Sequence, residues 1–293
     1  MATNGNSESI YILNSGPGQS EQDRLNAQHH LFTALMQGDM LPPHIASSLS
    51  ALPAPKVMDI ATGSGVWLYE IGKTLSPDAE LVGLDFDTSK FPSSPQAPNI
   101  TLRQANMLEP FTSDLLGKFD VVHMRLILYA LKAGYAVDLM KNIMTLLKPG
   151  GYVVWSETGP LYTTIQPPSK AWFKFQEYNW EWAQQYNADP GLPVSMQHYM
   201  KQAGYVECDD KVYIGNAQLY DTKNGKDWQS RMTSQCVTFI TQAIPGLISL
   251  GGVKGLTTEE EANQLIAELR EELPGRNVNH TFVRAWGRKS TTA

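Results

Sequence analysis

The central part of the chain alternates short runs rich in apolar and β-branched residues with segments of helical periodicity. The short runs span 57–60, 81–84, 100–103, 119–123 and 152–155. Between them, 65–75 and 135–147 repeat apolar residues at spacings of three and four, which is typical of helices. Short buried strands that alternate with helices predict a parallel sheet covered on both faces, so the pattern indicates an α/β fold.

Both flanks of this core are predicted to be mainly helical. Residues 20–37 place apolar side chains on one face and end before Gly38, and the prolines at 42–43 should break the chain. After residue 157 we expect a proline-flanked loop at 160–168, helices at 170–186, 194–203, 228–244 and 259–272, and strands at 205–214 and 282–286. The second half therefore adds a largely helical region to the alternating core.

One turn in the core carries the clearest chemical signal. The first apolar run leads into a turn that contains Gly63 and Gly65, and the next run ends in Asp85. A glycine-containing turn between a strand and a helix lets a ligand approach the backbone, and an acid on the next strand can bind a ribose. The unit predicts a site for a nucleoside-containing cofactor. The plain alternative is an ordinary turn of an α/β protein.

This turn departs from the pattern of a dinucleotide site. In G-x-G-x-x-G three glycines suit a pyrophosphate, but the third position here is the bulky Leu68, and no lysine suits a P-loop. A ligand without phosphate needs an acceptor for its ammonium and close backbone contact, which Asp59, Gly63 and Gly65 could supply. These residues resemble motif I of class I S-adenosylmethionine (SAM) dependent methyltransferases, D-x-G-x-G-x-G, with Ala61 in place of the first glycine.

Two further segments extend the resemblance. The sequence Lys-Pro-Gly-Gly at 148–151, ahead of a strand, is a common turn of that family. The stretch from Tyr11 to His29 is similar to a segment of fungal secondary-metabolite methyltransferases of the gliotoxin N-methyltransferase kind, where it lies over cofactor and substrate. The resemblance implies a Rossmann-like, seven-stranded sheet with helices on both faces, an antiparallel closing pair of strands and a helical lid.

The same resemblance divides the chain and implies an activity. It gives an N-terminal helical cap segment over 1–50, a SAM-binding core over 51–157, and a substrate lid with the closing strands over 158–293. The implied reaction moves a methyl group from SAM to an N, O or S atom of a small, apolar or aromatic natural product. S-adenosylhomocysteine is then the second product.

Candidate cofactor residues follow from strand ends, because ligands of open α/β sheets bind beyond the carboxyl ends of the strands. Asp85 should accept from the ribose hydroxyls. Asn106 and Met107 follow the third strand, where the family often has an Asp that binds adenine, and the Asn106 amide oxygen could replace it. An Asn that caps a local turn is the alternative. The full set is Asp59, Ala61, Gly63, Gly65, Asp85, Asn106, Met107 and His123.

Two histidines are candidates for a general base. His123 ends the fourth strand, at the edge that faces the methyl donor in the family, and histidine titrates near working pH. His29 is the second candidate. The alternative for His123 is a buried histidine bonded to backbone, and a base is needed only if the nucleophile arrives protonated. We assign no role to His280.

The substrate candidates are mainly aromatic. Aromatic side chains recur three and four residues apart over 170–186, and core packing is the first explanation for such a stripe. Because Phe173 and Trp180 lie on another face, this helix should use two faces. One would pack on the sheet, and the other would line a substrate pocket or contact a dimer partner. The candidates are Tyr11, Arg125, Trp155, Trp172, Phe175, Tyr178 and Trp182.

The composition of the chain limits the kinds of binding partner that we expect. The net charge of −6 disfavours nucleic acid and anionic membranes, and two cysteines without metal-site spacing give no reason to expect a metal or a disulfide framework. Residues 1–9 lack an apolar signal core, and no apolar stretch reaches membrane-spanning length. We expect a cytoplasmic protein with a small-molecule substrate. The long helices from residue 228 could serve a homodimer.

Three other functions stay open at this level. A related enzyme could use the SAM sulfonium to stabilise a rearrangement or pericyclic reaction without methyl transfer. A methyltransferase-like protein could also serve as a non-catalytic partner, because fold does not fix function. A nicotinamide dehydrogenase is disfavoured by Leu68 and would bind a dinucleotide.

Overall fold

The computed structural model describes residues 12–13, 19–94, 97–215 and 225–292. Its strands are β1 (Lys56–Ile60), β2 (Glu80–Asp85), β3 (Ile100–Gln104), β4 (Phe119–Arg125), β5 (Leu147–Glu157), β6 (Thr163–Gln166), β7 (Val206–Ile214) and β8 (Asn277–Arg288). Its helices are α1 (Gln19–Leu35), α2 (Pro43–Ser50), α3 (Val66–Gly72), α4 (Ala136–Leu146), α5 (Lys170–Gln185), α6 (Leu192–Ala203), α8 (Gly225–Ser249) and α9 (Glu259–Glu272). Short 3-10 turns are η1 (Thr88–Lys90), η2 (Leu128–Ala130) and η3 (Pro160–Tyr162). The predicted alternation of strands and helices is confirmed.

The strands form one sheet in the order β3-β2-β1-β4-β5-β8-β6, with β7 also paired to β8. The first five are parallel, and β8 is antiparallel to each of its partners. β5 pairs with residues 283–288 of β8 and β6 with residues 277–280, so these two strands follow one another along β8. The sheet therefore has one strand more than the seven expected, and that strand is β6.

Three local expectations were wrong. The segment 160–168 was expected to be a loop, but its Thr-Thr-Ile-Gln run alternates buried and exposed side chains and forms β6. The prolines at 42–43 do not simply break the chain, because Pro43 begins α2, where a missing N–H is tolerated. The Lys-Pro-Gly-Gly segment is part of β5, beside a register shift in β4, rather than a turn ahead of the strand.

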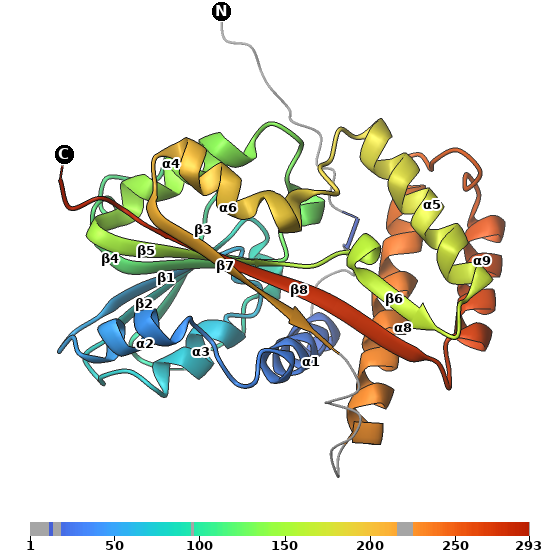
Figure 1. The fold of residues 1–293 in the computed structure, drawn as a ribbon, viewed down its shortest axis with the longest axis horizontal. Coiled ribbons are helices and arrows are strands. Elements are labelled where there is room, and N and C mark those ends of the chain that lie inside the picture. The colour runs from blue at the N-terminus through green and yellow to red at the C-terminus, as the bar shows by residue number, and fades with distance from the viewer. Residues whose placement is uncertain (1–11, 14–18, 95–96, 216–224, 293) are drawn as a thin grey trace, which may run out of the picture.

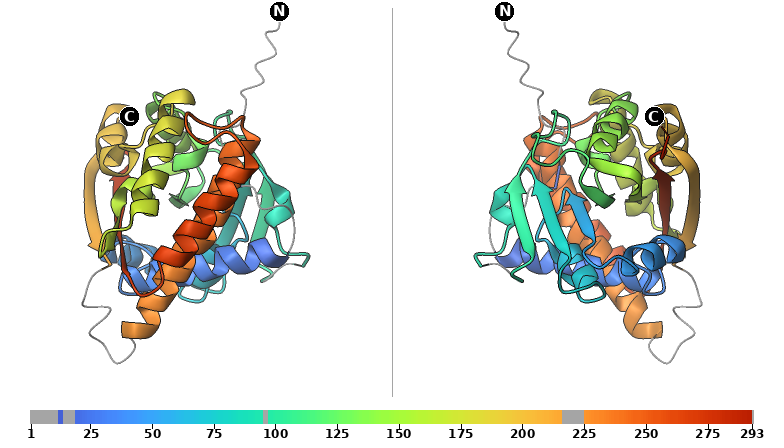
Figure 2. Two further views of the ribbon diagram at one scale, coloured as in Figure 1. Left: turned by 90° about the vertical axis from the view of Figure 1, so that its right-hand side faces the viewer. Right: turned by 90° about the vertical axis from the view of Figure 1, so that its left-hand side faces the viewer.

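Helices cover both faces of the sheet (Figure 1). α2 and α3 lie on one face and α4 and α6 on the other, while α5, α8 and α9 pack together beyond the carboxyl ends of the parallel strands. In the left view of Figure 2, α5 and α9 stand in front of the sheet, which matches the expected helical lid. Within the described residues, no helix combines the length and the apolar character needed to cross a membrane.

One hydrophobic cluster joins the lid to the core. It runs from Met140 and Ile143 of α4 to Phe175 of α5, Ile240 of α8 and Leu265 of α9, all of which are almost fully buried. Burial of such side chains is worth about 1.5–3 kcal/mol each. The lid is thus held in place by the same apolar packing as the sheet, and what it encloses has fixed walls.

Candidate functional site

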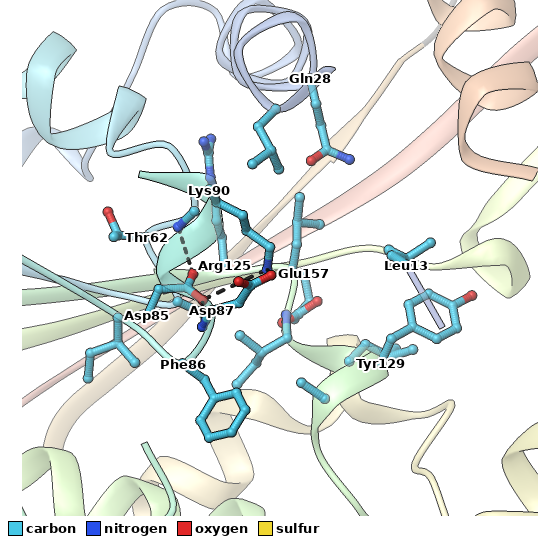
Figure 3. A pocket seen from close by; sticks show the side chains of 18 of the residues that line it. Leu13, Gln28, Thr62, Asp85, Phe86, Asp87, Lys90, Arg125, Tyr129 and Glu157 are labelled. Atoms are coloured by element: carbon cyan, nitrogen blue, oxygen red, sulfur yellow. Dashed lines mark hydrogen bonds and ion pairs between the residues drawn. The ribbon is translucent and has the colours of Figure 1, made fainter. Parts of the chain in front are cut away.

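A cavity of about 770 Å³ lies between the carboxyl ends of the strands and the lid. Its walls come from the turn between β1 and α3, the ends of β2, β4 and β5, the loop after β3, and side chains of α1, α5 and α8. Leu13 of the N-terminal segment also lines it (Figure 3). This is the position that the strand-end rule predicts for a ligand.

The motif turn forms one end of the cavity. Ala61, Gly63 and Gly65 have φ of 55°, 57° and 76°, a left-handed conformation that glycine adopts without strain. Ala61 and Gly63 line the cavity, while Gly65 caps α3 behind them. The alanine in the first glycine position therefore keeps the backbone path of the motif.

Asp85 lies beside this turn with its carboxylate partly used by backbone. Its Oδ2 accepts from the Gly63 N–H at 2.8 Å and its Oδ1 from the Asp87 N–H at 2.9 Å. The Lys90 Nζ is 3.8 Å from Asp85 Oδ1. An ionised carboxylate has about four acceptor positions, so Asp85 keeps capacity for two hydroxyl groups.

The loop after β3 places both of its candidates, Asn106 and Met107, on the cavity wall. The Asn106 Oδ1 accepts from the Leu108 N–H at 3.1 Å, and its Nδ2 donates to Glu109 at 3.2 Å. Asn106 therefore caps a local turn, as in the alternative interpretation, but it also lines the cavity, so its role in binding adenine stays a prediction. Met107 lines the cavity together with Phe86, and both offer apolar contacts to a flat ring.

His123 does not lie in the cavity. Its ring stacks on Trp67 at 3.8 Å, and its Nδ1 bonds the Asp59 carboxylate at 2.7 Å. Burial lowers the pKa of His123 to about 4 even though Asp59 acts to raise it. His123 and Arg125 lie two residues apart and so share a face of the sheet, but Arg125 is at the end of β4 and lines the cavity, whereas His123 lies further back along the strand against the Trp67 ring. The expected cofactor and base roles of His123 are revised accordingly.

Asp59 shares this arrangement. Its second carboxylate oxygen accepts from the Thr62 hydroxyl at 2.7 Å, so both oxygens bind side chains of the chain itself. Asp59 is 3% exposed and is not part of the cavity wall. It therefore holds the motif turn and the His123 ring, and direct contact with a cofactor ammonium is not what this geometry favours.

His29 is likewise unsuited to proton transfer. It lies on α1, is almost fully buried and does not line the cavity, whereas its neighbour Gln28 does. Burial, followed by the charge of Arg125, lowers the pKa of His29 to about 2. A histidine that cannot take a proton near neutral pH cannot act as the base proposed from the sequence.

We predict that His29→Leu makes the protein less sensitive to acid. The unfolded state binds a proton at this histidine below pH 6.5 and the folded state does not, so the native residue loses stability as pH falls below 6.5. Relative to native protein, the variant should gain about 2 kcal/mol on going from pH 7.5 to pH 5. Urea unfolding at both pH values measures this, and an equal difference at the two would contradict it.

The aromatic stripe of α5 is mostly core. Trp172 lines the cavity, but Phe175 and Trp182 are buried in the hydrophobic cluster, and Tyr178 packs near Gly255 away from it. Trp155 is also fully buried, outside the cavity wall. Core packing, the first explanation of the stripe, therefore accounts for these side chains, and the substrate role expected for them is revised. Tyr11 lies outside the described residues.

Six residues of the cavity wall carry a buried polar atom without a hydrogen-bond partner among the described residues. These atoms are Arg24 Nη1, Arg125 Nη1, Glu157 Oε2, Trp172 Nε1, Gln235 Nε2 and His280 Nε2. Leaving such a group unpaired costs about 1–3 kcal/mol. The two arginines lie toward the motif turn, and the last three residues lie on the lid and β8. The concentration of unpaired groups indicates that ligands bind along the whole cavity.

Glu157, which the sequence analysis did not select, is the most unusual of these groups. It ends β5 and is 0% exposed. Its Oε1 accepts from the Ile127 N–H at 2.7 Å and from the Trp155 indole at 2.9 Å. Burial raises its pKa to about 8, although these donors act to lower it. The strand-end rule that selected Asp85 would have found Glu157 as well.

His280 is a second residue that the sequence analysis left without a role. It lies on β8, lines the cavity, and shares a 2.7 Å hydrogen bond with the Thr163 hydroxyl of β6 through its Nδ1. Burial lowers the pKa of His280 to about 4, so the ring is neutral at pH 7. β6 and β8 thus present a neutral hydrogen-bonding group to the lid end of the cavity.

Ile12 and Leu13 of the N-terminal segment lie between α8 and the cavity. A Cβ added to Gly246 would lie 1.9 Å from the Ile12 carbonyl oxygen, so only glycine allows this contact. Ile12 is 1% exposed and Leu13 lines the cavity beside it. The segment similar to fungal methyltransferases therefore does reach the site.

We predict that Gly246→Ala destabilises the protein, by about 1–3 kcal/mol, because the segment must shift. In an open helix position the same change would stabilise by up to about 1 kcal/mol. Thermal unfolding measures the sign, with Ser230→Ala on the exposed face of α8 as the control. A gain in stability would show that the segment does not rest on α8.

Several known proteins that are similar to this chain are methyltransferases. A model of the methyltransferase domain family matches residues 28–243. The N-methyltransferase tcpN of Claviceps purpurea is 28% identical over 279 residues, 93% of this chain and 95% of tcpN. The methyltransferase grgD of Penicillium sp. is 33% identical over 164 residues, 54% of this chain and 55% of grgD. A solved phosphoethanolamine N-methyltransferase 2 of Haemonchus contortus has a TM-score of 0.48 and 14% identity, over 84% of this chain and 51% of its own.

Proposed function

This chain belongs to the methyltransferase domain family, and from that premise we propose which part of its cavity holds each reactant. The protein is a SAM-dependent methyltransferase of small molecules. The motif turn, Asp85 and Met107 form the cofactor end. The lid, Glu157 and His280 form the acceptor end. The observation that carries this proposal is the continuity of one cavity from Gly63 to Trp172.

The residues at the first end fit SAM. Asp85 keeps acceptor positions for both ribose hydroxyls, and Phe86 and Met107 suit the faces of an adenine ring. The buried Nη1 atoms of Arg24 and Arg125 have no partner among the described residues and suit a carboxylate such as that of the cofactor's amino-acid part. When bound, SAM supplies an electrophilic methyl group. Asp59 supports local structure, whereas Asn106 caps its turn and also lines this end of the cavity, where its amide oxygen keeps an acceptor position.

The acceptor end suits a mainly apolar or aromatic molecule. Tyr129, Trp172 and Phe239 supply aromatic walls, and the polar groups that face them are few. Leu13 and the lid exclude water, and the chain's own task is to hold the acceptor in line with the methyl group. Methylation of a fungal type of natural product is supported by the relatives tcpN and grgD. A cytoplasmic location, a homodimer and the absence of nucleic-acid binding stay predictions.

Turnover with a panel of small aromatic amines, phenols and thiols tests this function. We expect S-adenosylhomocysteine and a methylated acceptor in equal amounts, measured by mass spectrometry. Conversion of an acceptor without S-adenosylhomocysteine would favour a rearrangement or pericyclic enzyme. SAM binding with no turnover, together with a copurifying protein, would favour a non-catalytic partner. Either outcome would contradict the proposal.

A further inference from the structure

The carboxyl group of Glu157 faces the cavity with one oxygen unused. Oε1 is held by the Ile127 N–H and the Trp155 indole, which fixes the side chain, while Oε2 has no partner among the described residues. Glu157 is 0% exposed, so water does not solvate it as at a surface. A fixed, buried carboxyl with a free oxygen is a preformed acceptor for a donor on a ligand.

Glu157 lies where the two ends of the cavity meet. In the view of Figure 3 it sits between Asp85 on one side and Tyr129 on the other. Asp85 belongs to the proposed cofactor end, and Tyr129 packs against Trp182 of the lid at 4.9 Å. A reacting atom of the acceptor has to lie near this junction to reach a methyl group.

With Arg125 bound to the cofactor carboxylate, as in the proposed function, the remaining groups around Glu157 do not compensate an ionised carboxylate there. Its hydrogen-bond donors are an indole and backbone N–H groups, which carry no net charge. The titratable groups that share the cavity around it are Tyr129 of η2, His280 of β8 and Arg125 of β4. His280 is neutral at pH 7, and so is Tyr129, because burial, followed by the charge of Glu157, raises its pKa. Arg125 is positively charged, and in the proposed function this charge faces the carboxylate of the cofactor. The site therefore favours a ligand that brings a positive charge.

We propose that Glu157 binds an amine of the acceptor and takes its proton, so that the substrate is an apolar or aromatic amine. This inference rests on the proposed function. The acceptor enters as an ammonium ion, and its positive charge releases the proton that Glu157 carries at pH 7 to solvent. One N–H proton of the bound ammonium ion then passes to Glu157 Oε2. The lone pair freed on nitrogen forms the new C–N bond as the bond between methyl carbon and sulfur breaks, with that electron pair remaining on sulfur. The product leaves as the methylated ammonium ion.

The raised pKa of Glu157 supports this role. A carboxyl with an ordinary pKa holds a proton too weakly to free an amine, whereas one near 8 competes with an ammonium ion that the same apolar pocket makes more acidic. An alcohol or hydrocarbon acceptor brings no charge to stabilise the ionised carboxyl, so Glu157 keeps its proton and stays neutral beside it. The pocket should therefore distinguish amines from uncharged analogues of the same shape.

Titration calorimetry with 2-phenylethylamine and 2-phenylethanol, each added to protein saturated with S-adenosylhomocysteine, tests the inference. Native protein should bind the amine at least tenfold more tightly than the alcohol. At pH 7 amine binding should release roughly one proton, measured in buffers of different ionisation enthalpy. Glu157→Gln should lose both the preference and the proton release, while Glu177→Gln, an exposed change on α5, should keep them.

The outcomes separate the inference from the function on which it rests. If S-adenosylhomocysteine binds but native protein shows no preference for the amine, or if Glu157→Gln keeps the preference and the proton release, the assignment of Glu157 is wrong. If S-adenosylhomocysteine does not bind native protein, the proposed function fails instead. Unchanged S-adenosylhomocysteine affinity in Glu157→Gln shows that the variant is folded with its cofactor end intact.

Discussion

Replacing Asp85 by alanine should weaken S-adenosylhomocysteine binding roughly 100-fold, about 3 kcal/mol. Asp85 lies on the cavity wall beside the motif turn and keeps free acceptor positions there. Hydrogen bonds to charged groups contribute about 1.5–3 kcal/mol each, and a ribose offers two hydroxyls. The change also removes the acceptor of the Gly63 N–H, so the turn itself loses support.

Calorimetric titration of the variant with S-adenosylhomocysteine measures this effect. Asp78→Ala, at an exposed position before β2, is the matched control and should bind like native protein. Asp85→Asn separates the effect of charge from that of shape, because its amide oxygen still accepts a hydrogen bond while the charge is lost. Its affinity for S-adenosylhomocysteine should lie between those of native protein and Asp85→Ala. A near-native affinity in Asp85→Ala would place the ribose elsewhere and contradict the proposed cofactor end.

Replacing Glu157 by glutamine should stabilise the ligand-free protein at pH 8 but not at pH 5. The pKa of Glu157 rises from 4.5 in the unfolded chain to about 8 in the folded one. Between these values the folded state keeps a proton that the unfolded state has lost. Native stability is therefore complete below pH 4.5 and falls as pH rises toward 8, on the order of 1.4 kcal/mol for each pH unit. Glutamine does not titrate and avoids this loss.

Urea unfolding of native protein and Glu157→Gln at pH 5 and pH 8 checks this prediction. The stability difference should be small at pH 5 and amount to several kcal/mol at pH 8, on the linkage scale above. Glu177→Gln should show no such pH-dependent difference. Equal differences at the two pH values would mean that the Glu157 carboxyl is ionised in the folded protein. A substitution that removes a functional carboxyl can stabilise the protein, because a buried ionisable group that is kept for function lowers the free energy of unfolding.

The sequence predicted the alternating core well because the two periodicities, 3.6 and 2, are local properties. The motif turn and Asp85 were also predictable, since a turn with left-handed residues and an acid at a strand end are visible without tertiary contacts. Glu157 lies at an equivalent strand end and was overlooked. The signal was an acid after an apolar run, two residues beyond Trp155.

The errors have a common physical origin in tertiary packing, which decides which side chains reach the cavity. His123 and Arg125 both lie at the end of β4 but only Arg125 lines the cavity, while His123 stacks on Trp67. A strand end predicts the neighbourhood of a site. How far back along the strand the cavity reaches depends on packing against α3, whose Trp67 covers the His123 ring. The substrate role predicted for the aromatic residues of α5 was wrong for a similar reason. An apolar stripe on a helix does not show whether it packs against the core or against a ligand.

The central claim is that this cavity binds SAM, and the most direct test is calorimetric titration of the native protein with S-adenosylhomocysteine and with NAD. The account predicts micromolar binding of S-adenosylhomocysteine, one molecule per chain, and no heat of binding with NAD. Binding of NAD, or no binding of S-adenosylhomocysteine, would contradict it.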